Sequence, residues 1–130
     1  SYSLPEKFTG ESSDIVTSLA LEFISEQARA KQPFLAVVWF GSPHVPHEAL
    51  PADKAAYSDL PEATQNYYGE LTAIDRSVGR LREALRDLQV ADDTLLWYCS
   101  DNGGAAGPQS TGGLRGSKGR SGKGVCGCPA

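Results

Sequence analysis

The fold of this chain is constrained most by two apolar segments, residues 34–40 and 94–99, which are separated by a long amphipathic stretch. Segment 34–40 reads Phe-Leu-Ala-Val-Val-Trp-Phe, so a strand built from it would be apolar on both faces. Strands of this kind are buried on both sides and are typical of parallel sheets covered by helices. The sequence therefore predicts an α/β fold with parallel strands and covering helices.

Two helices are predicted from apolar residues at helical spacing. The first has Ser12 or Ser13 as its N-cap and runs to about Ala30, where residues 31–33 break it. The second covers residues 62–88, and its charged residues are interpreted as a solvated face. Its apolar residues recur at alternating steps of four and three, which places them on one helix face: Tyr67, Leu71, Ile74, Val78, Leu81, Leu85 and Leu88.

The order strand, long helix, strand predicts a right-handed crossover between parallel strands. Ligands of open α/β sheets collect at the carboxyl ends of the strands. His44 follows the first predicted strand and Asp101 follows the second. We therefore expect both residues to face the same crevice.

The second strand ends in Ser-Asp-Asn-Gly-Gly, residues 100–104. Asp101 and Asn102 offer carboxylate and amide oxygens, the ligands that calcium or magnesium prefers. Adjacent side chains at a strand end point in different directions, so they can share a metal only if the backbone bends there, which Gly103 would permit. The alternative is that Asp101 or Asn102 closes the strand in an Asx-type turn and binds no metal.

Two further side chains could contact an anionic substrate. His44 lies in a loop with a proline on each side, and could bind an anion or donate a proton; an isolated loop histidine can also be merely exposed. Lys118 lies between glycines in the glycine-rich loop 103–119, where its point charge would suit phosphate or sulfate, or would simply be solvated. His47 has no such supporting pattern.

The composition excludes some function classes. A net charge of −4 and the lack of a basic stripe with interleaved aromatics indicate that nucleic acid is not a partner. No apolar run approaches the roughly 20 residues of a membrane-spanning helix. The three cysteines do not suggest a disulfide framework or a zinc site, and Cys99 is expected to be a small core residue. Compartment and oligomeric state are left open.

The motifs Ser-Pro-His-x-Pro, Ser-Asp-Asn-Gly-Gly and Leu-Arg-Gly-x-Lys-Gly occur here in that order. From about residue 13 to residue 119 the chain closely resembles the type I sulfatases of the alkaline-phosphatase-like superfamily. The resemblance implies a partial alkaline-phosphatase-like fold and a hydrolase of sulfate esters, with sulfated glycans among its substrates. It matches Asp101 and Asn102 to calcium ligands, Lys118 to the lysine that contacts the sulfate group, and His44 to the histidine that binds sulfate or assists the leaving oxygen.

Two departures from the family pattern limit what this chain can do. The Cys/Ser-x-Pro-x-Arg motif that supplies the formylglycine nucleophile is missing, and so is the second aspartate pair of the metal site. Residues 1–119 are therefore interpreted as the middle portion of a sulfatase catalytic domain, inactive alone. The resemblance implies a periplasmic, extracellular or lysosomal location. The alternatives are a related phosphodiesterase or phosphonate hydrolase, or a non-catalytic truncated domain.

The tail, residues 120–130, is expected to be out of frame. After Lys118 and Gly119 the family continues Thr-Leu-Trp/Tyr-Glu-Gly-Gly-Val/Ile-Arg-Val-Pro, whereas this chain reads Arg-Ser-Gly-Lys-Gly-Val-Cys-Gly-Cys-Pro. Codons that encode the observed residues give Thr-Leu-Trp-Glu-Gly-Gly-Val-Arg-Val-Pro when read one base earlier. The loss of a base near the Lys118 and Gly119 codons would explain the tail, and Cys126 and Cys128 would then have no function.

Overall fold

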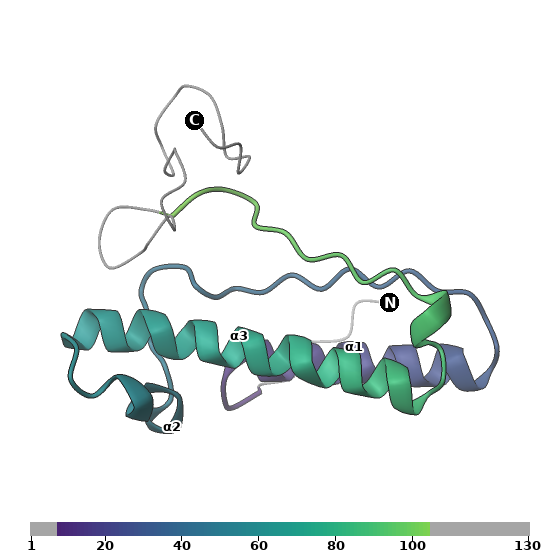
Figure 1. Ribbon diagram of the computed structural model, residues 1–130, viewed down its shortest axis with the longest axis horizontal. Helices are drawn as coiled ribbons and strands as arrows, with labels where there is room; N and C mark the ends of the chain where they lie inside the picture. The colour runs from purple at the N-terminus through teal and green to yellow at the C-terminus, as the bar shows by residue number, and fades with distance from the viewer. Residues whose placement is uncertain (1–7, 105–130) are drawn as a thin grey trace.

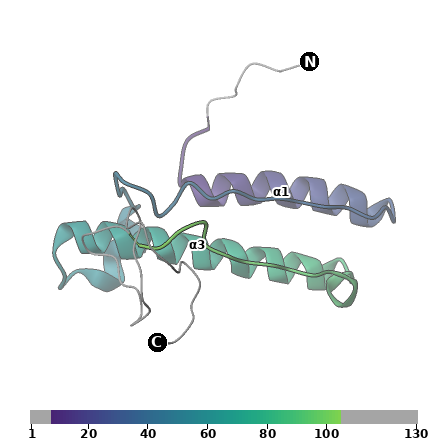
Figure 2. The ribbon, with the colours of Figure 1, turned by 90° about the horizontal axis from the view of Figure 1, so that it is seen from above.

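The computed structural model describes residues 8–104. The elements follow in the order α1 (Ser12–Arg29), α2 (Pro51–Lys54), the 3-10 turn η1 (Ala55–Tyr57), α3 (Glu62–Asp87) and the 3-10 turn η2 (Ala91–Asp93). Helices α1 and α3 lie side by side, and two extended segments cross one side of the pair (Figure 1). Seen from above, segment 32–41 follows α1 and segment 94–100 follows α3, and both run in the same direction (Figure 2).

Helix α1 is confirmed, but its N-cap differs from the prediction. The Glu11 carboxylate caps the helix by accepting the backbone N–H of Asp14 at 2.8 Å. The same carboxylate accepts the hydroxyl of Ser13 at 3.1 Å, and Ser13 is fully buried. Neither serine is therefore the N-cap, because Ser13 is already inside the helix and packed into the protein.

Both long helices end in a residue with left-handed backbone. Lys31 has φ 52° and Gln89 has φ 57°, backbone angles that residues other than glycine rarely adopt. After α3, the N–H of Val90 donates to the carbonyl of Leu85 at 3.0 Å, and an equivalent bond closes α1. This hydrogen-bond pattern satisfies orphan carbonyls at a helix end and reverses the chain. Each helix thus sends the next segment back along its own length.

The core lies between the helix pair and the extended segments. Ile24 of α1 packs with Leu81 and Leu85 of α3, and the ring of Phe34 meets that of Phe23 edge to face at 6.4 Å. The apolar stripe predicted on α3 is confirmed, because four of its members are buried: Tyr67, Ile74, Leu81 and Leu85.

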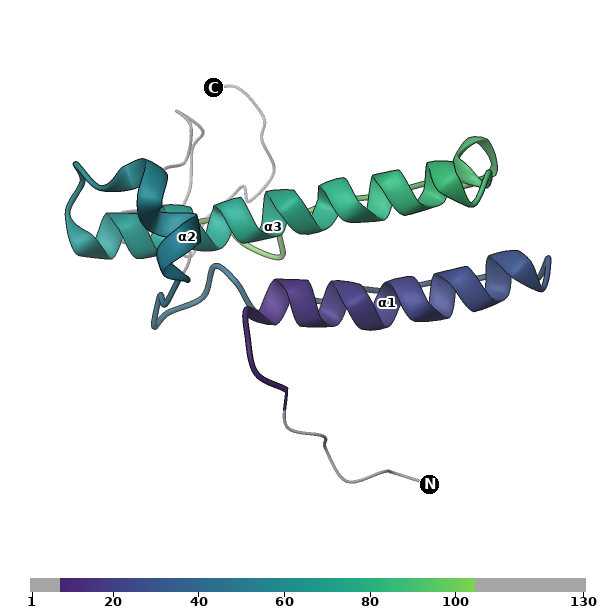
Figure 3. The same cartoon turned by 90° about the horizontal axis from the view of Figure 1, so that it is seen from below.

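Parallel strands are not confirmed. Segments 34–40 and 94–99 are extended and run in the same direction, yet no β-strand is assigned anywhere in residues 8–104. A two-stranded sheet is marginally stable alone, and parallel strands are stabilised by cover on both faces. Here the helices cover one face only, and Figure 3 shows both helices on the same side of the two segments.

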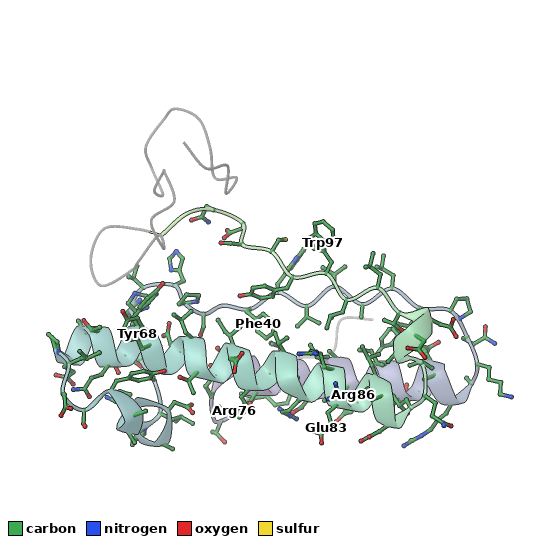
Figure 4. The ribbon with its side chains drawn as sticks, in the orientation of Figure 1. Phe40, Tyr68, Arg76, Glu83, Arg86 and Trp97 are labelled. Carbon is green, nitrogen blue, oxygen red and sulfur yellow. The ribbon has the colours of Figure 1, made fainter. Side chains whose placement is uncertain are left out.

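The other face of the extended segments is apolar and exposed. Leu35, Val37 and Trp39 alternate with partly buried neighbours and are 84%, 66% and 85% exposed. Trp97 on the second segment is 75% exposed, and its side chain points away from the helices (Figure 4). Cys99 is also exposed, so its prediction as a core residue is wrong, because nothing covers this side within the described residues.

The connection between residue 48 and α3 contains two short elements, α2 and η1, that pack across the N-terminal part of α3. Close packing there depends on Gly69, since a Cβ at that position would lie 2.5 Å from the Cβ of Ala49. The hydroxyl groups of Tyr57 and Thr72 are hydrogen-bonded at 2.9 Å and add a polar contact. No helix of the described part is long and apolar enough to cross a membrane.

Arg76 corrects the prediction of a wholly solvated charged face on α3. Its guanidinium donates to the Asp14 carboxylate of α1 at 2.8 Å and to both oxygens of Asp53 of α2. The Asp53 side chain is only 7% exposed, whereas those of Asp14 and Arg76 are 31% and 37% exposed. Arg80 adds a bond to the Ser18 hydroxyl at 2.9 Å. Ion pairs on one face of α3 thus connect it to both α1 and α2.

Candidate functional site

A pocket of about 360 Å³ opens where the two extended segments end. Residues 40–45 form one side of it and residues 100–104 form the other. His44, Asp101 and Asn102, which are far apart in the sequence, therefore line the same pocket, as the predicted topology required. Helix α3 contributes Tyr67 and Leu71 to the wall.

The Asp101-Asn102 tip is bent. The hydroxyl of Ser100 donates to the carbonyl of Asn102 at 2.6 Å, and the chain turns at residues 101 and 102. A serine bond to a carbonyl two residues on is a local alternative to strand pairing. It closes the segment in the way predicted for an Asx-type turn, but the hydroxyl of Ser100 makes the bond. Asp101 is exposed and Asn102 is partly buried.

His44 is exposed and its ring is oriented by the backbone. Its Nδ1 lies 2.8 Å from the carbonyl oxygen of Val45. A carbonyl oxygen can only accept, so Nδ1 carries the hydrogen and Nε2 carries the lone pair in the neutral ring. The peptide bonds before Pro43 and Pro46 are both cis. The hydrogen bond to Val45 thus orients the ring and favours the tautomer that carries the hydrogen on Nδ1.

Two tyrosines form an aromatic side of the pocket. Tyr67 comes from α3 and Tyr98 from the second extended segment. Burial raises the pKa of the Tyr67 hydroxyl above its ordinary value of 10.0, and the neighbouring phenols of Tyr68 and Tyr98 raise it further. At neutral pH Tyr67 is thus a neutral hydrogen-bond donor, and the pocket wall carries no negative charge from it.

His47, which no sequence pattern supported, is held directly behind this wall. Its Nδ1 lies 3.1 Å from a carboxylate oxygen of Glu70, and the two side chains are 8% and 6% exposed. Its ring meets that of Tyr67 at 5.2 Å. One signal in the sequence could have revealed the pair: Glu70 lies on the apolar stripe of α3, three residues after Tyr67 and four before Ile74, and a charge there needs a partner.

The pocket offers some of the ligands of a hard cation. Asp101 and Asn102 present carboxylate and amide oxygens at one rim, which fits calcium chemically. Calcium takes about six to eight oxygens, and residues 8–104 contain no group of three or more acidic, histidine or cysteine side chains suited to a metal. The tip is therefore at most part of a calcium site. Lys118, Cys126 and Cys128 lie outside the described residues.

A family model for sulfatases matches residues 1–125. The chain belongs to the sulfatase family. The N-acetylgalactosamine-6-sulfatase of Homo sapiens is 35% identical over 103 residues, which are 75% of this chain and 18% of that protein. The ulvan-active sulfatase of Formosa agariphila is 31% identical over 98 residues, 62% of this chain and 19% of that protein.

Two solved structures resemble this sulfatase chain in fold. Ps i-CgsB is 31% identical with a TM-score of 0.77 over 82% of this chain and 24% of its own. Its complex with k-i-k-neocarrahexaose gives 33% identity and a TM-score of 0.67, over 72% of this chain and 21% of its own. This sulfatase chain thus spans about a fifth of the length of the relatives that it matches.

Proposed function

We propose that residues 1–119 are the middle portion of a sulfatase catalytic domain, and that the complete protein hydrolyses sulfate esters of glycans. The observation that carries the proposal is the pocket shared by His44, Asp101 and Asn102 in a chain that a sulfatase model matches. The names of the relatives favour a glycan, since they include an N-acetylgalactosamine-6-sulfatase, an ulvan-active sulfatase and a complex with k-i-k-neocarrahexaose.

In this proposal four residues, His44, Asp101, Asn102 and Lys118, together hold a sulfate group. Asp101 and Asn102 ligate calcium, which would supply positive charge against the sulfate oxygens. Lys118 adds a point charge from the glycine-rich loop. His44, with Nδ1 committed to the carbonyl of Val45, uses Nε2 to bind sulfate or to protonate the leaving oxygen. These three contributions, from the cation that Asp101 and Asn102 would hold, from Lys118 and from His44, would stabilise negative charge on the sulfuryl group as it is transferred.

The chain alone is expected to be inactive. The formylglycine nucleophile and the remaining metal ligands would come from parts of the domain outside this sequence. A periplasmic, extracellular or lysosomal location belongs to the same proposal. The comparisons favour a sulfatase over a related phosphodiesterase or phosphonate hydrolase, because the matched family model and the named relatives are sulfatases.

The test is hydrolysis by the complete protein that carries this segment. It should release sulfate from an aryl sulfate and from sulfated galactan oligosaccharides, and should prefer both to a phosphate diester. Asp101→Ala and His44→Ala should each lower kcat/KM about 100-fold or more, the size of effect that follows loss of one electrostatic group in an active site. Asp101→Ala should also weaken calcium binding.

Asp92→Ala is the matched control, because it removes an exposed carboxylate from η2, far from the pocket lining. It should leave the activity unchanged. A complete protein that hydrolyses the phosphate diester faster than any sulfate ester would refute the proposal. Turnover of the aryl sulfate by the 130-residue chain would refute the expected inactivity of the segment alone.

A further inference from the structure

The buried pair of His47 and Glu70 has no assigned task, although it lies next to the pocket. It joins a loop to a helix across 23 positions of sequence. Burying an imidazole and a carboxylate removes both from water, and the bond between them does little more than offset that cost. Because the pair contributes little to stability, we asked which neighbouring residues it orients.

Glu70 holds two successive residues of the loop. One carboxylate oxygen faces Nδ1 of His47 at 3.1 Å, and the other accepts the backbone N–H of Glu48 at 2.9 Å. One turn earlier on α3, the amide oxygen of Asn66 accepts the N–H of Ala49 at 3.3 Å. The loop is therefore fastened to α3 at three consecutive residues, directly after the segment that carries His44.

The space between loop and helix is also small. A Cβ added at Gly69 would lie 2.5 Å from the Cβ of Ala49. The loop at Ala49 is therefore packed directly against the backbone of α3 at Gly69. On its other side His47 touches Tyr67, whose ring also lines the pocket. His47 is therefore in direct contact with a residue of the pocket wall.

The opposite end of the loop is fixed by packing. Phe34 and Ala36 of the first extended segment lie against the core between α1 and α3. Residues 41–46 bridge from this segment to the fastened residues 47–49, and His44 lies within the bridge. We propose that His47 is a positioning residue: its bond to Glu70 sets where His44 stands in the pocket. This inference rests on the proposed sulfatase function.

The test compares three variants of the complete protein. His47→Leu removes the bond to Glu70 and should lower kcat about 10- to 100-fold, as loss of a supporting partner does, with KM little changed. His47→Asn keeps a donor near the place of Nδ1 and should restore kcat to within about 3-fold of the parent. Glu70→Gln keeps an acceptor for the N–H of Glu48, and its kcat should lie between those of His47→Leu and His47→Asn.

Leu85→Ala is the control for mere loss of stability. It opens a cavity at the C-terminal part of α3, away from the loop, and should leave kcat unchanged below its melting temperature.

The outcomes separate the inference from the function on which it rests. An active parent with a fully active, folded His47→Leu variant refutes the positioning role and leaves the sulfatase proposal intact. A His47→Asn variant as impaired as His47→Leu also refutes it, because the donor would then not matter. A parent that hydrolyses no sulfate ester refutes the sulfatase proposal, and the positioning role falls with it.

Discussion

Replacing Arg76 with alanine should destabilise this chain, because Arg76 is bonded to carboxylates of both α1 and α2. The substitution removes the only cation that the structure, over residues 8–104, places against the Asp53 carboxylate. Asp53 is 7% exposed, so it would remain a buried charge without its partner. The same substitution also breaks the bond from α3 to Asp14 of α1.

The magnitude follows from the exposure of the three side chains. Stranding one member of a buried ion pair costs about 3–5 kcal/mol, whereas an exposed pair contributes about 0–1 kcal/mol. Because Arg76 is 37% exposed, water can reach Asp53 once the guanidinium is gone. We therefore expect a loss of about 2–3 kcal/mol in the free energy of unfolding, which for a domain of this size lowers the melting temperature by about 10–15 °C.

The assay is urea and thermal unfolding of Arg76→Ala beside Arg82→Ala, which removes an exposed arginine from the same helix. Adding Asp53→Asn should recover much of the loss, since it removes the stranded charge.

The effect should depend on pH. The hydrogen bonds from Arg76 lower the pKa of the Asp14 carboxyl below its ordinary 3.8. The ionised form is thus favoured in the folded state, and this stabilisation is present above that value and lost as the pH falls through the lowered pKa. The gap between parent and Arg76→Ala should narrow below about pH 4. Equal melting of Arg76→Ala and Arg82→Ala at pH 7, or a gap unchanged at pH 2, would contradict the reasoning.

Three further substitutions test the packing. Gly69→Ala should destabilise the chain by about 1–3 kcal/mol through overpacking, because its Cβ would lie 2.5 Å from the nearest side chain; Gly79→Ala, which meets nothing within 4 Å, should be neutral or stabilising by up to about 1 kcal/mol. Leu85→Ala should cost about 2–5 kcal/mol in urea unfolding. Trp39 and Trp97, both largely exposed, should be quenched efficiently by acrylamide in the isolated chain, and strong protection of both would show that the apolar face is covered.

Much of the architecture could be predicted because it depends on local pattern. The spacing of apolar residues located α1 and α3, and the order of the segments placed His44 and Asp101 at one pocket. Their chemical roles stay predictions. Strand pairing was not predictable from the segments themselves, because it depends on neighbours that residues 8–104 do not supply. Cys99 was misassigned for the same reason: an apolar sequence does not reveal whether anything covers it.

Sequence reasoning missed one local helix cap and two sets of long-range polar contacts. Glutamate is an unusual N-cap residue, so the pattern did not indicate Glu11. Ser13, which the pattern did suggest, is buried inside the helix. Arg76 resembles any solvated arginine until α1 and α2 bring carboxylates to it. His47 is a lone loop histidine in the sequence, and only the fold shows that α3 presents Glu70 to it.

Because left-handed residues reverse the chain after α1 and α3, the number of residues between each reversal and the pocket determines where His44 and Asp101 lie. The two extended segments begin just after Lys31 and Gln89, and both run from there toward the pocket. Side chains alternate along an extended segment, so one inserted or deleted residue would exchange its inner and outer faces. It would also carry His44 or Asp101 past the rim. Homologous chains should therefore keep the number of residues between Lys31 and His44 and between Gln89 and Asp101, while insertions and deletions should accumulate elsewhere.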